Sequence, residues 1–145
     1  RYEISNYAKE GQECIHNLKY WQGGDYLGLG LGAASCMEHE RWSNARGLTD
    51  YEDRICRGQK PVEQTEELGE EEQKAEFMFL GLRCMEGVSA EQFEKKFHQS
   101  VEERYGKVLH KYENMGLMRL VNGNWQLTEQ GIDVSNHIFA DFLPE

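Results

Sequence analysis

One histidine in this sequence has neighbours that suggest metal chemistry. His16 begins the run HNLKYW, so Asn17, Tyr20 and Trp21 follow it within five positions. A neutral imidazole is a good axial ligand for haem iron, and nearby aromatic rings can stack on a porphyrin. The run therefore suggests a haem site with His16 as the metal ligand. On composition alone, however, a lone histidine beside aromatic residues is more often a structural hydrogen-bonding residue, and both interpretations stay open at this point.

A second pattern is the alternation of glycine with leucine. Gly28, Gly30 and Gly32 stand at every second position. Glycines at this spacing let the backbone approach either a bound cofactor or a neighbouring strand. The spacing differs from the G-x-G-x-x-G of dinucleotide sites, which disfavours a nucleotide site of that type. A cofactor wall and a packed strand remain the two alternatives.

No other residues form a recognisable catalytic set, and we assign no catalytic residue. The remaining histidines are scattered and are expected to be surface or packing residues: His39, His98, His110 and His137. The four cysteines are Cys14, Cys36, Cys56 and Cys84. No two of them have the spacing with which a pair of thiolates reaches one metal from a single turn. We expect reduced, mostly packed thiols in a cytoplasmic protein.

The composition is that of an acidic globular protein. The 145 residues carry a formal net charge of −10, which disfavours binding to nucleic-acid phosphates. No run approaches the ~18 consecutive apolar residues of a membrane-spanning helix. The first residues are polar and resemble no signal peptide, so we expect a chain cut from a longer one.

The second half of the sequence has clear helical periodicity. From residue 74 onward, apolar spacing, capping boxes at Ser89 and Ser100, and the turn Asn122-Gly123 predict three helices, a hairpin and a closing helix. This order is typical of a winged helix. The third helix is electrically neutral and the hairpin tip lacks a cation, which favours a packing module over a DNA reader. At the other end of the sequence, residues 2–8 are expected to form a short β-strand that ends in a turn.

Three motifs together resemble a known family. They are YEISNYA at 2–8, HNLKYW at 16–21 and GGDYLGLGLGAAS at 23–35. In order and spacing they are similar to motifs of the radical S-adenosylmethionine proteins that include oxygen-independent coproporphyrinogen III oxidase, and in particular to those of the HemW haem chaperones. The sequences at 87–89 and 114–117 resemble the family's C-terminal domain, so nearly the whole chain is covered. One departure is that Ala34 or Ser35 stands where the family commonly has histidine.

The resemblance implies an α+β fold with two domains. Residues 1–58 would supply the last strands of a partial (β/α) barrel and its closing segment, residues 59–73 a linker, and residues 74–145 a winged-helix-like C-terminal domain. The parent protein would bind S-adenosylmethionine and a [4Fe–4S] cluster through a CxxxCxxC motif that this chain lacks.

The same resemblance implies roles for the site residues. His16, Asn17, Tyr20 and Trp21 match the motif linked to haem, with His16 as the leading iron ligand and Tyr20 and Trp21 lining the porphyrin. Gly28, Gly30 and Gly32 would lie near the pocket for S-adenosylmethionine and substrate.

Three functional hypotheses follow. The first is a fragment of a haem chaperone that binds haem and transfers it to haem-requiring acceptor proteins. The second is a fragment of an oxygen-independent coproporphyrinogen III oxidase, which decarboxylates propionates in porphyrin biosynthesis. The third is a winged-helix interaction or DNA-binding module. In the first two the chain is not a complete enzyme, and its partners are haem or a porphyrin and the N-terminal barrel of the parent.

Overall fold

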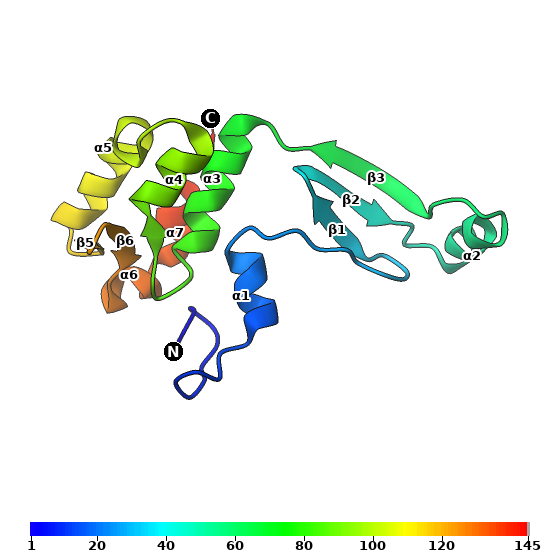
Figure 1. Cartoon of the computed structure of the whole chain (residues 1–145), viewed down its shortest axis with the longest axis horizontal. Coiled ribbons are helices and arrows are strands. Elements are labelled where there is room, and N and C mark those ends of the chain that lie inside the picture. Colours follow the sequence, from blue (N-terminus) through cyan, green and yellow to red (C-terminus); the bar gives the residue numbers. More distant parts are fainter. Residues whose placement is uncertain (145) are drawn as a thin grey trace. The chain divides into compact units, whose positions relative to one another are not determined.

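The chain forms two compact units in a computed structural model that describes residues 1–144. The helical unit comprises residues 1–23 and the described residues from 71 onward, and the sheet unit comprises residues 24–70. Both units contain helices and antiparallel strands (Figure 1). The mixed helix-and-sheet composition expected from the sequence is therefore confirmed.

The sheet unit is a three-stranded antiparallel meander with one helix. Its elements are β1 (Ala34–Met37), β2 (Glu40–Asn44), α2 (Leu48–Cys56) and β3 (Val62–Glu67), and the strand order is β1-β2-β3. Glu38 and His39 form the turn between β1 and β2, with φ angles of 48° and 74°. Positive φ at both positions is the conformation that a two-residue hairpin requires, although glycine and asparagine adopt it more readily.

The sheet unit buries very little apolar surface. Its buried hydrophobic residues are Ala45 and Leu68, which are joined by the buried polar residues Ser35 and Asn44. A small sheet needs a hydrophobic face packed against another layer to be stable in water. The sheet unit therefore lacks the large buried apolar face that stabilises an independent sheet.

The helical unit contains a second three-stranded sheet. Its elements are α1 (Ile15–Trp21), α3 (Glu70–Gly81), β4 (Val88–Ser89), α4 (Ala90–Phe97), α5 (Val101–Asn114), β5 (Met118–Val121), β6 (Asn124–Leu127), α6 (Glu129–Asp133) and α7 (Ser135–Ala140). The strand order is β4-β6-β5, so the strand that precedes α4 pairs with the second strand of the later hairpin.

One hydrophobic core holds the helical unit together. Its most deeply buried side chains come from α3 and from every later element except α6: Met78, Leu82, Val88, Phe93, Val101, Leu109, Met118, Trp125, Ile138 and Phe142. At about 25 cal/mol per Å², burial of this many large side chains is the main stabilising term. The helical periodicity also predicts Met115 on the buried side of the third helix; that residue is 58% exposed, whereas Leu109 is fully buried.

The predicted helix caps and turns of this unit are confirmed. Ser89 Oγ accepts a hydrogen bond from the backbone N–H of Gln92, and Ser100 Oγ accepts one from that of Glu103. Each side chain satisfies a backbone donor that the first turn of a helix leaves unpaired. The hairpin turn has positive φ at both Asn122 and Gly123, as the sequence predicts.

The first half of the chain differs from the expectation. Residues 2–8 form no strand; Glu3 makes isolated bridges with Asn6 and Cys84. The expected linker, 59–73, contains β3 and the start of α3. The contacts also group residues 1–23 with the helices, whereas the sequence suggested a domain of residues 1–58. Whether residues 1–58 complete a barrel in a longer protein stays a prediction.

No helix among residues 1–144 combines the length and the apolar character needed to cross a membrane.

Candidate functional site

The candidate metal ligand lies on a short, exposed helix. His16 stands in the first turn of α1 and its side chain is exposed. Its ring centroid lies 4.9 Å from that of Tyr20, and the two planes are 89° apart. Residues four apart share a face of a helix, which explains the edge-to-face contact. No hydrogen bond or ion pair with a described residue engages the imidazole ring, so its nitrogen atoms are available to a ligand.

The other two residues of the motif connect α1 to the rest of the helical unit. Asn17 Nδ2 donates to the hydroxyl of Tyr2 across 3.4 Å. The guanidinium carbon of Arg83 lies 4.3 Å from the centroid of the Trp21 indole. The indole N–H of Trp21 is buried and has no hydrogen-bond partner among residues 1–144. His16 and Tyr20 thus lie together on one face of α1, while Asn17 and Trp21 attach the helix to the rest of the helical unit.

A buried carboxylate organises the segment that Trp21 packs against. Glu3 is 0% exposed. Its side chain accepts hydrogen bonds from the backbone N–H of Ser5 at 2.9 Å and from the amide group of Asn6. Arg83 Nη2 lies 3.3 Å from Glu3 Oε2 and 3.3 Å from Ser5 Oγ. These bonds fold residues 3–6 into a tight turn, which is why the expected strand does not form.

Backbone hydrogen bonds fasten the same segment to the end of α3. The N–H of Ile4 donates to the carbonyl of Arg83 at 3.0 Å, and the N–H of Met85 donates to the carbonyl of Tyr2 at 3.1 Å. Sequence reasoning missed Glu3 and Arg83 as site residues. The available signal was a charged residue inside the motif YEISN, but nothing in the sequence pointed to a partner 80 positions away.

The cysteines do not form a metal site. All four are free, and Cys14 and Cys56 are exposed, so the expectation of mostly packed thiols was wrong for these two. Burial first, and then the negative charge of Glu3, raise the pKa of Cys84 to about 11. This thiol is therefore protonated near neutral pH and is a poor metal ligand. No group of three or more histidine, cysteine or acidic side chains among the described residues could hold a metal ion.

The glycines of the second motif belong to the sheet unit, and the local backbone favours glycine at each of these positions. A Cβ atom on Gly28 would lie 2.2 Å from the carbonyl oxygen of Ala34. Gly30 and Gly32 have φ angles of 102° and 65°, which residues with side chains rarely adopt. The segment is an irregular turn that leads into β1, with a bridge between Tyr26 and Cys36. At Gly28 the close approach is therefore to a neighbouring backbone, whereas a Cβ atom on Gly30 would meet no atom within 4 Å.

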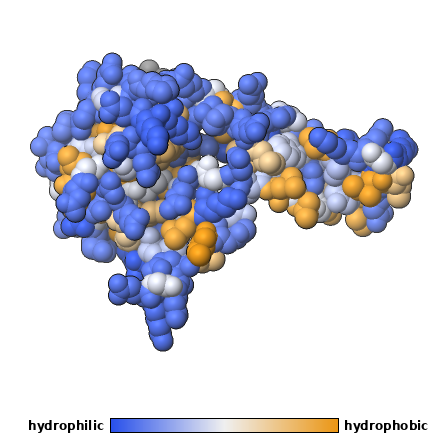
Figure 2. Space-filling view, viewed as in Figure 1, coloured by the Kyte–Doolittle hydropathy of each residue, from blue (hydrophilic) through white to orange (hydrophobic). Residues whose placement is uncertain are grey.

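The leucines between these glycines are exposed. Leu27, Leu29 and Leu31 are 61%, 85% and 47% exposed. Apolar side chains are also visible on the surface of the sheet unit (Figure 2). Single exposed leucines are common, but several in a row usually mark an interaction surface.

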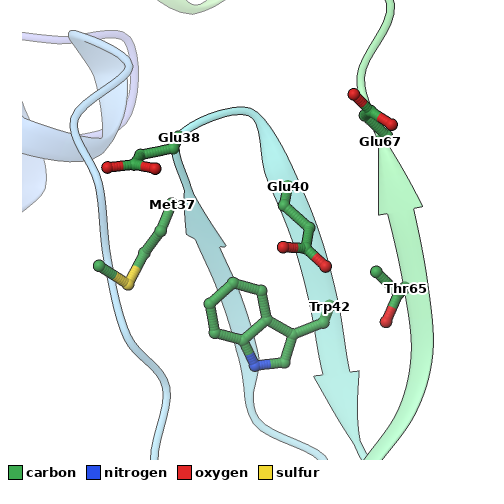
Figure 3. A pocket seen from close by; sticks show the side chains of 6 residues that line it. All are labelled: Met37, Glu38, Glu40, Trp42, Thr65 and Glu67. Atoms are coloured by element: carbon green, nitrogen blue, oxygen red, sulfur yellow. The ribbon is translucent and has the colours of Figure 1, made fainter.

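A hollow of about 610 Å³ lies on one face of the sheet unit. It is lined by Met37, Glu38, Glu40, Trp42, Thr65 and Glu67 (Figure 3). The strand register places Glu40 opposite Glu67, and Trp42 opposite Thr65. No hydrogen bond or ion pair among the described residues engages the three carboxylates. Haem carries negatively charged propionates, so this acidic hollow is electrostatically unsuited to it.

The other histidines lie apart from α1 in sequence, and three of them have structural roles. His39 forms the β1–β2 turn, and His98 ends α4 in a left-handed conformation. His110 lies between Glu113 and Glu102, at 2.9 Å and 3.1 Å. The hydrogen bond to Glu113 and the charge of Glu102 raise the pKa of His110. His137 is exposed on α7.

Comparisons with known proteins agree with the motif resemblance. Residues 68–134 match the family model described as the HemN C-terminal domain. The whole chain is 39% identical to the protein named Heme chaperone HemW of Bacillus subtilis (strain 168), covering 38% of that protein. The chain is also 34% identical to Heme chaperone HemW of Lactococcus lactis, over 98% of this chain and 37% of the relative. The chain thus spans well under half the length of these relatives.

A solved structure has the same fold over most of the chain. It is titled as coproporphyrinogen III oxidase (HemN) from Escherichia coli, a radical SAM enzyme. The TM-score is 0.68 with 18% identity, over 82% of this chain and 28% of that one. At this identity the likeness concerns the fold. The sequence matches, which extend along nearly all of this chain, confirm the resemblance seen in the motifs: the chain is similar to proteins named Heme chaperone HemW, and residues 68–134 match the HemN C-terminal domain.

Proposed function

We propose that the chain is the C-terminal part of a longer haem chaperone, which binds haem and passes it to haem-requiring acceptor proteins. The observation that carries the proposal is the 39% identity along the whole chain to a protein named Heme chaperone HemW. The exposed imidazole of His16, whose nitrogen atoms no described residue engages, supplies a suitable ligand for the cargo.

The face of α1 that carries His16 suits a planar, anionic porphyrin. His16 would bind the iron, and the ring of Tyr20 at 4.9 Å would lie beside the porphyrin. Lys19, three positions after His16, is exposed and supplies a cation for a propionate on the same side of the helix. Asn17 and Trp21 belong to the site in our proposal because they hold α1 in place. That Trp21 also lines the porphyrin stays a prediction.

We assign the chemistry of S-adenosylmethionine and the [4Fe–4S] cluster to the rest of the longer protein. The residues of this chain do not fit such a cluster, because the described part contains no group of three suitable ligands. Gly28, Gly30 and Gly32 remain proposed neighbours of the S-adenosylmethionine pocket. The exposed leucines between them and the small core of the sheet unit support packing of this unit against a preceding barrel.

For the helical unit we propose a winged-helix arrangement used for packing. The order α3, β4, α4, α5 and the hairpin β5–β6, with β4 paired to β6, supports this arrangement. The charges of α5 are partly neutralised by ion pairs, as between Arg104 and Glu71 and between Lys111 and Asp141. A DNA-reading helix instead presents uncompensated cations to phosphates.

We place the protein in the cytoplasm, where its four free thiols stay reduced.

A titration of the full-length protein with haem, followed by absorbance, tests the proposal. A saturable Soret change near one haem per chain is the expected result. A parallel assay of the cluster-reconstituted protein with coproporphyrinogen III tests the decarboxylase hypothesis. Turnover of that substrate without saturable haem binding would replace the chaperone function by the enzymatic one.

A further inference from the structure

We propose that Arg83 is a positioning residue for the haem site: it sets the orientation of α1, and through it the direction of the His16 imidazole. The inference rests on the proposed function, because it concerns how the same site is held in place.

Helix α1 cannot hold its own orientation. It has seven residues, no side-chain cap, no acidic residue in its first turn and no buried residue. Isolated helices shorter than ~12 residues are marginal in water, so packing must stabilise this one. Two side-chain contacts attach it to the helical unit: the bond from Asn17 to Tyr2 and the stacking of Trp21 on Arg83. At 3.4 Å the first is a long hydrogen bond, so the Trp21–Arg83 contact is the stronger of these two.

The stacking of Trp21 also determines where His16 points. At about 100° per residue, two side chains five positions apart lie about 140° apart around a helix. Because Trp21 faces Arg83, His16 is turned away from the body of the unit and into solvent. Tyr20, four positions after His16, lies on the same face of the helix and contacts the imidazole ring. A rotation of α1 about its axis would move both rings.

Arg83 is well suited to this role because it is itself fixed. Its guanidinium pairs with the fully buried carboxylate of Glu3, and its carbonyl oxygen accepts a hydrogen bond from Ile4. The side chain of Arg83 is only 24% exposed. A planar guanidinium can stack on indole and donate to a carboxylate at the same time, whereas a lysine ammonium cannot do both in this geometry.

A double-mutant cycle on the full-length protein tests the inference. Haem affinity is measured for the parent, Arg83→Lys, His16→Ala and the double variant. Arg83→Lys keeps the charge that pairs with Glu3. We expect it to weaken haem binding roughly fivefold, the loss of a cation–π contact of about 1 kcal/mol. In the His16→Ala background the same change should have no further effect, because the orientation of α1 no longer matters.

A second measurement distinguishes a change in the orientation of α1 from general destabilisation of the protein. The indole N–H resonance of Trp21, assigned with Trp21→Phe, should shift in Arg83→Lys, while the indole resonance of the core residue Trp125 should stay in place. If Arg83→Lys binds haem like the parent, or weakens binding equally with and without His16, the inference is overturned and the chaperone proposal stands. If the parent protein shows no saturable haem binding, the chaperone proposal fails and the inference fails with it.

Discussion

The fully buried carboxylate of Glu3 forms an ion pair with Arg83, a residue 80 positions later in the chain. The pair joins the two parts of the sequence that make up the helical unit. The Glu3 carboxylate accepts the hydrogen bonds that hold the turn at residues 3–6. The Arg83 guanidinium stacks on the Trp21 indole. A motif at the beginning of the chain is thereby connected to the end of α3.

Replacement of Glu3 by Gln should destabilise the helical unit. The change leaves the Arg83 guanidinium mostly buried without its counter-charge, which costs about 3 kcal/mol in comparable pairs. Denaturant unfolding of the 145-residue chain measures the effect. The matched control is Glu10→Gln, at an exposed loop position, which should change the free energy of unfolding by less than about 0.5 kcal/mol. Equal stability of the two variants would show that the Glu3–Arg83 pair contributes nothing.

Replacement of Gly28 by Ala should disrupt the sheet unit. The new Cβ would lie 2.2 Å from the Ala34 carbonyl oxygen, a distance that forces the backbone to move. The hydrogen bond from the Gly28 N–H to Ser35 Oγ would be lost with it. Gly47→Ala is the control, because its Cβ would meet no atom within 4 Å. Backbone amide NMR shifts of residues 34–44 should change in the first variant alone. Unchanged shifts in Gly28→Ala would contradict a structural need for this glycine.

Replacement of Leu29 by Ser tests the packing of the sheet unit on a preceding domain. Leu29 is 85% exposed, so the change should leave the thermal stability of the 145-residue chain unaltered. In the full-length protein it should lower stability by about 2 kcal/mol, the cost of losing one buried leucine. Leu120→Ser, at a 50% exposed position of β5, should change the stability of both proteins by the same amount. A neutral Leu29→Ser variant of the full-length protein would show that no domain covers this surface.

The stability contributed by His110 should depend on pH. Its pKa in the folded protein is raised by the hydrogen bond to Glu113 and then by the charge of Glu102; the ring of Trp125 packs against it from β6. A raised folded-state pKa means that the folded state holds the proton more tightly than the unfolded state does. The contribution is therefore complete below the unfolded pKa of about 6.5 and is lost as the pH rises through the folded value.

The measurement is the Tm of the parent and of His110→Gln at a series of pH values. The Tm of the parent should exceed that of the variant by more at pH 5.5 than at pH 8.5. In a separate NMR titration, the midpoint for His110 should move to lower pH in Glu113→Gln. A Tm difference that grows with rising pH would contradict the assignment.

The sequence predicted the helical unit far better than the sheet unit. Ser89, Ser100 and the Asn122-Gly123 turn act through local hydrogen bonds and backbone conformation, which are readable from neighbouring residues. The turn at residues 3–6 and the strand β3 depend on partners distant in sequence. Glu3 pairs with Arg83, and β3 pairs with β2 through strongly polar residues that lack an alternating pattern. Periodicity carries no signal for either feature.

The site was predicted only in part, for the same reason. The motif HNLKYW identified the residues of α1, and the structure places His16 and Tyr20 in contact. The side chain that holds the helix in place, Arg83, lies outside every motif. The spacing of the glycine motif suggested a close approach to a cofactor or a strand. In the structure, the nearby Ala34 carbonyl explains the need for glycine at position 28, and positive φ angles explain it at positions 30 and 32.

The central claim is that His16 binds the iron of haem, and one comparison tests it most directly. Haem is titrated into the full-length protein and into its His16→Ala and His137→Ala variants, with the Soret band as the signal. His137 is the control because it is also an exposed helical histidine of the helical unit. We predict that His16→Ala weakens binding by at least about tenfold, or about 1.4 kcal/mol, and changes the Soret maximum, whereas His137→Ala matches the parent. Equal affinity and an unchanged spectrum in His16→Ala would contradict the account.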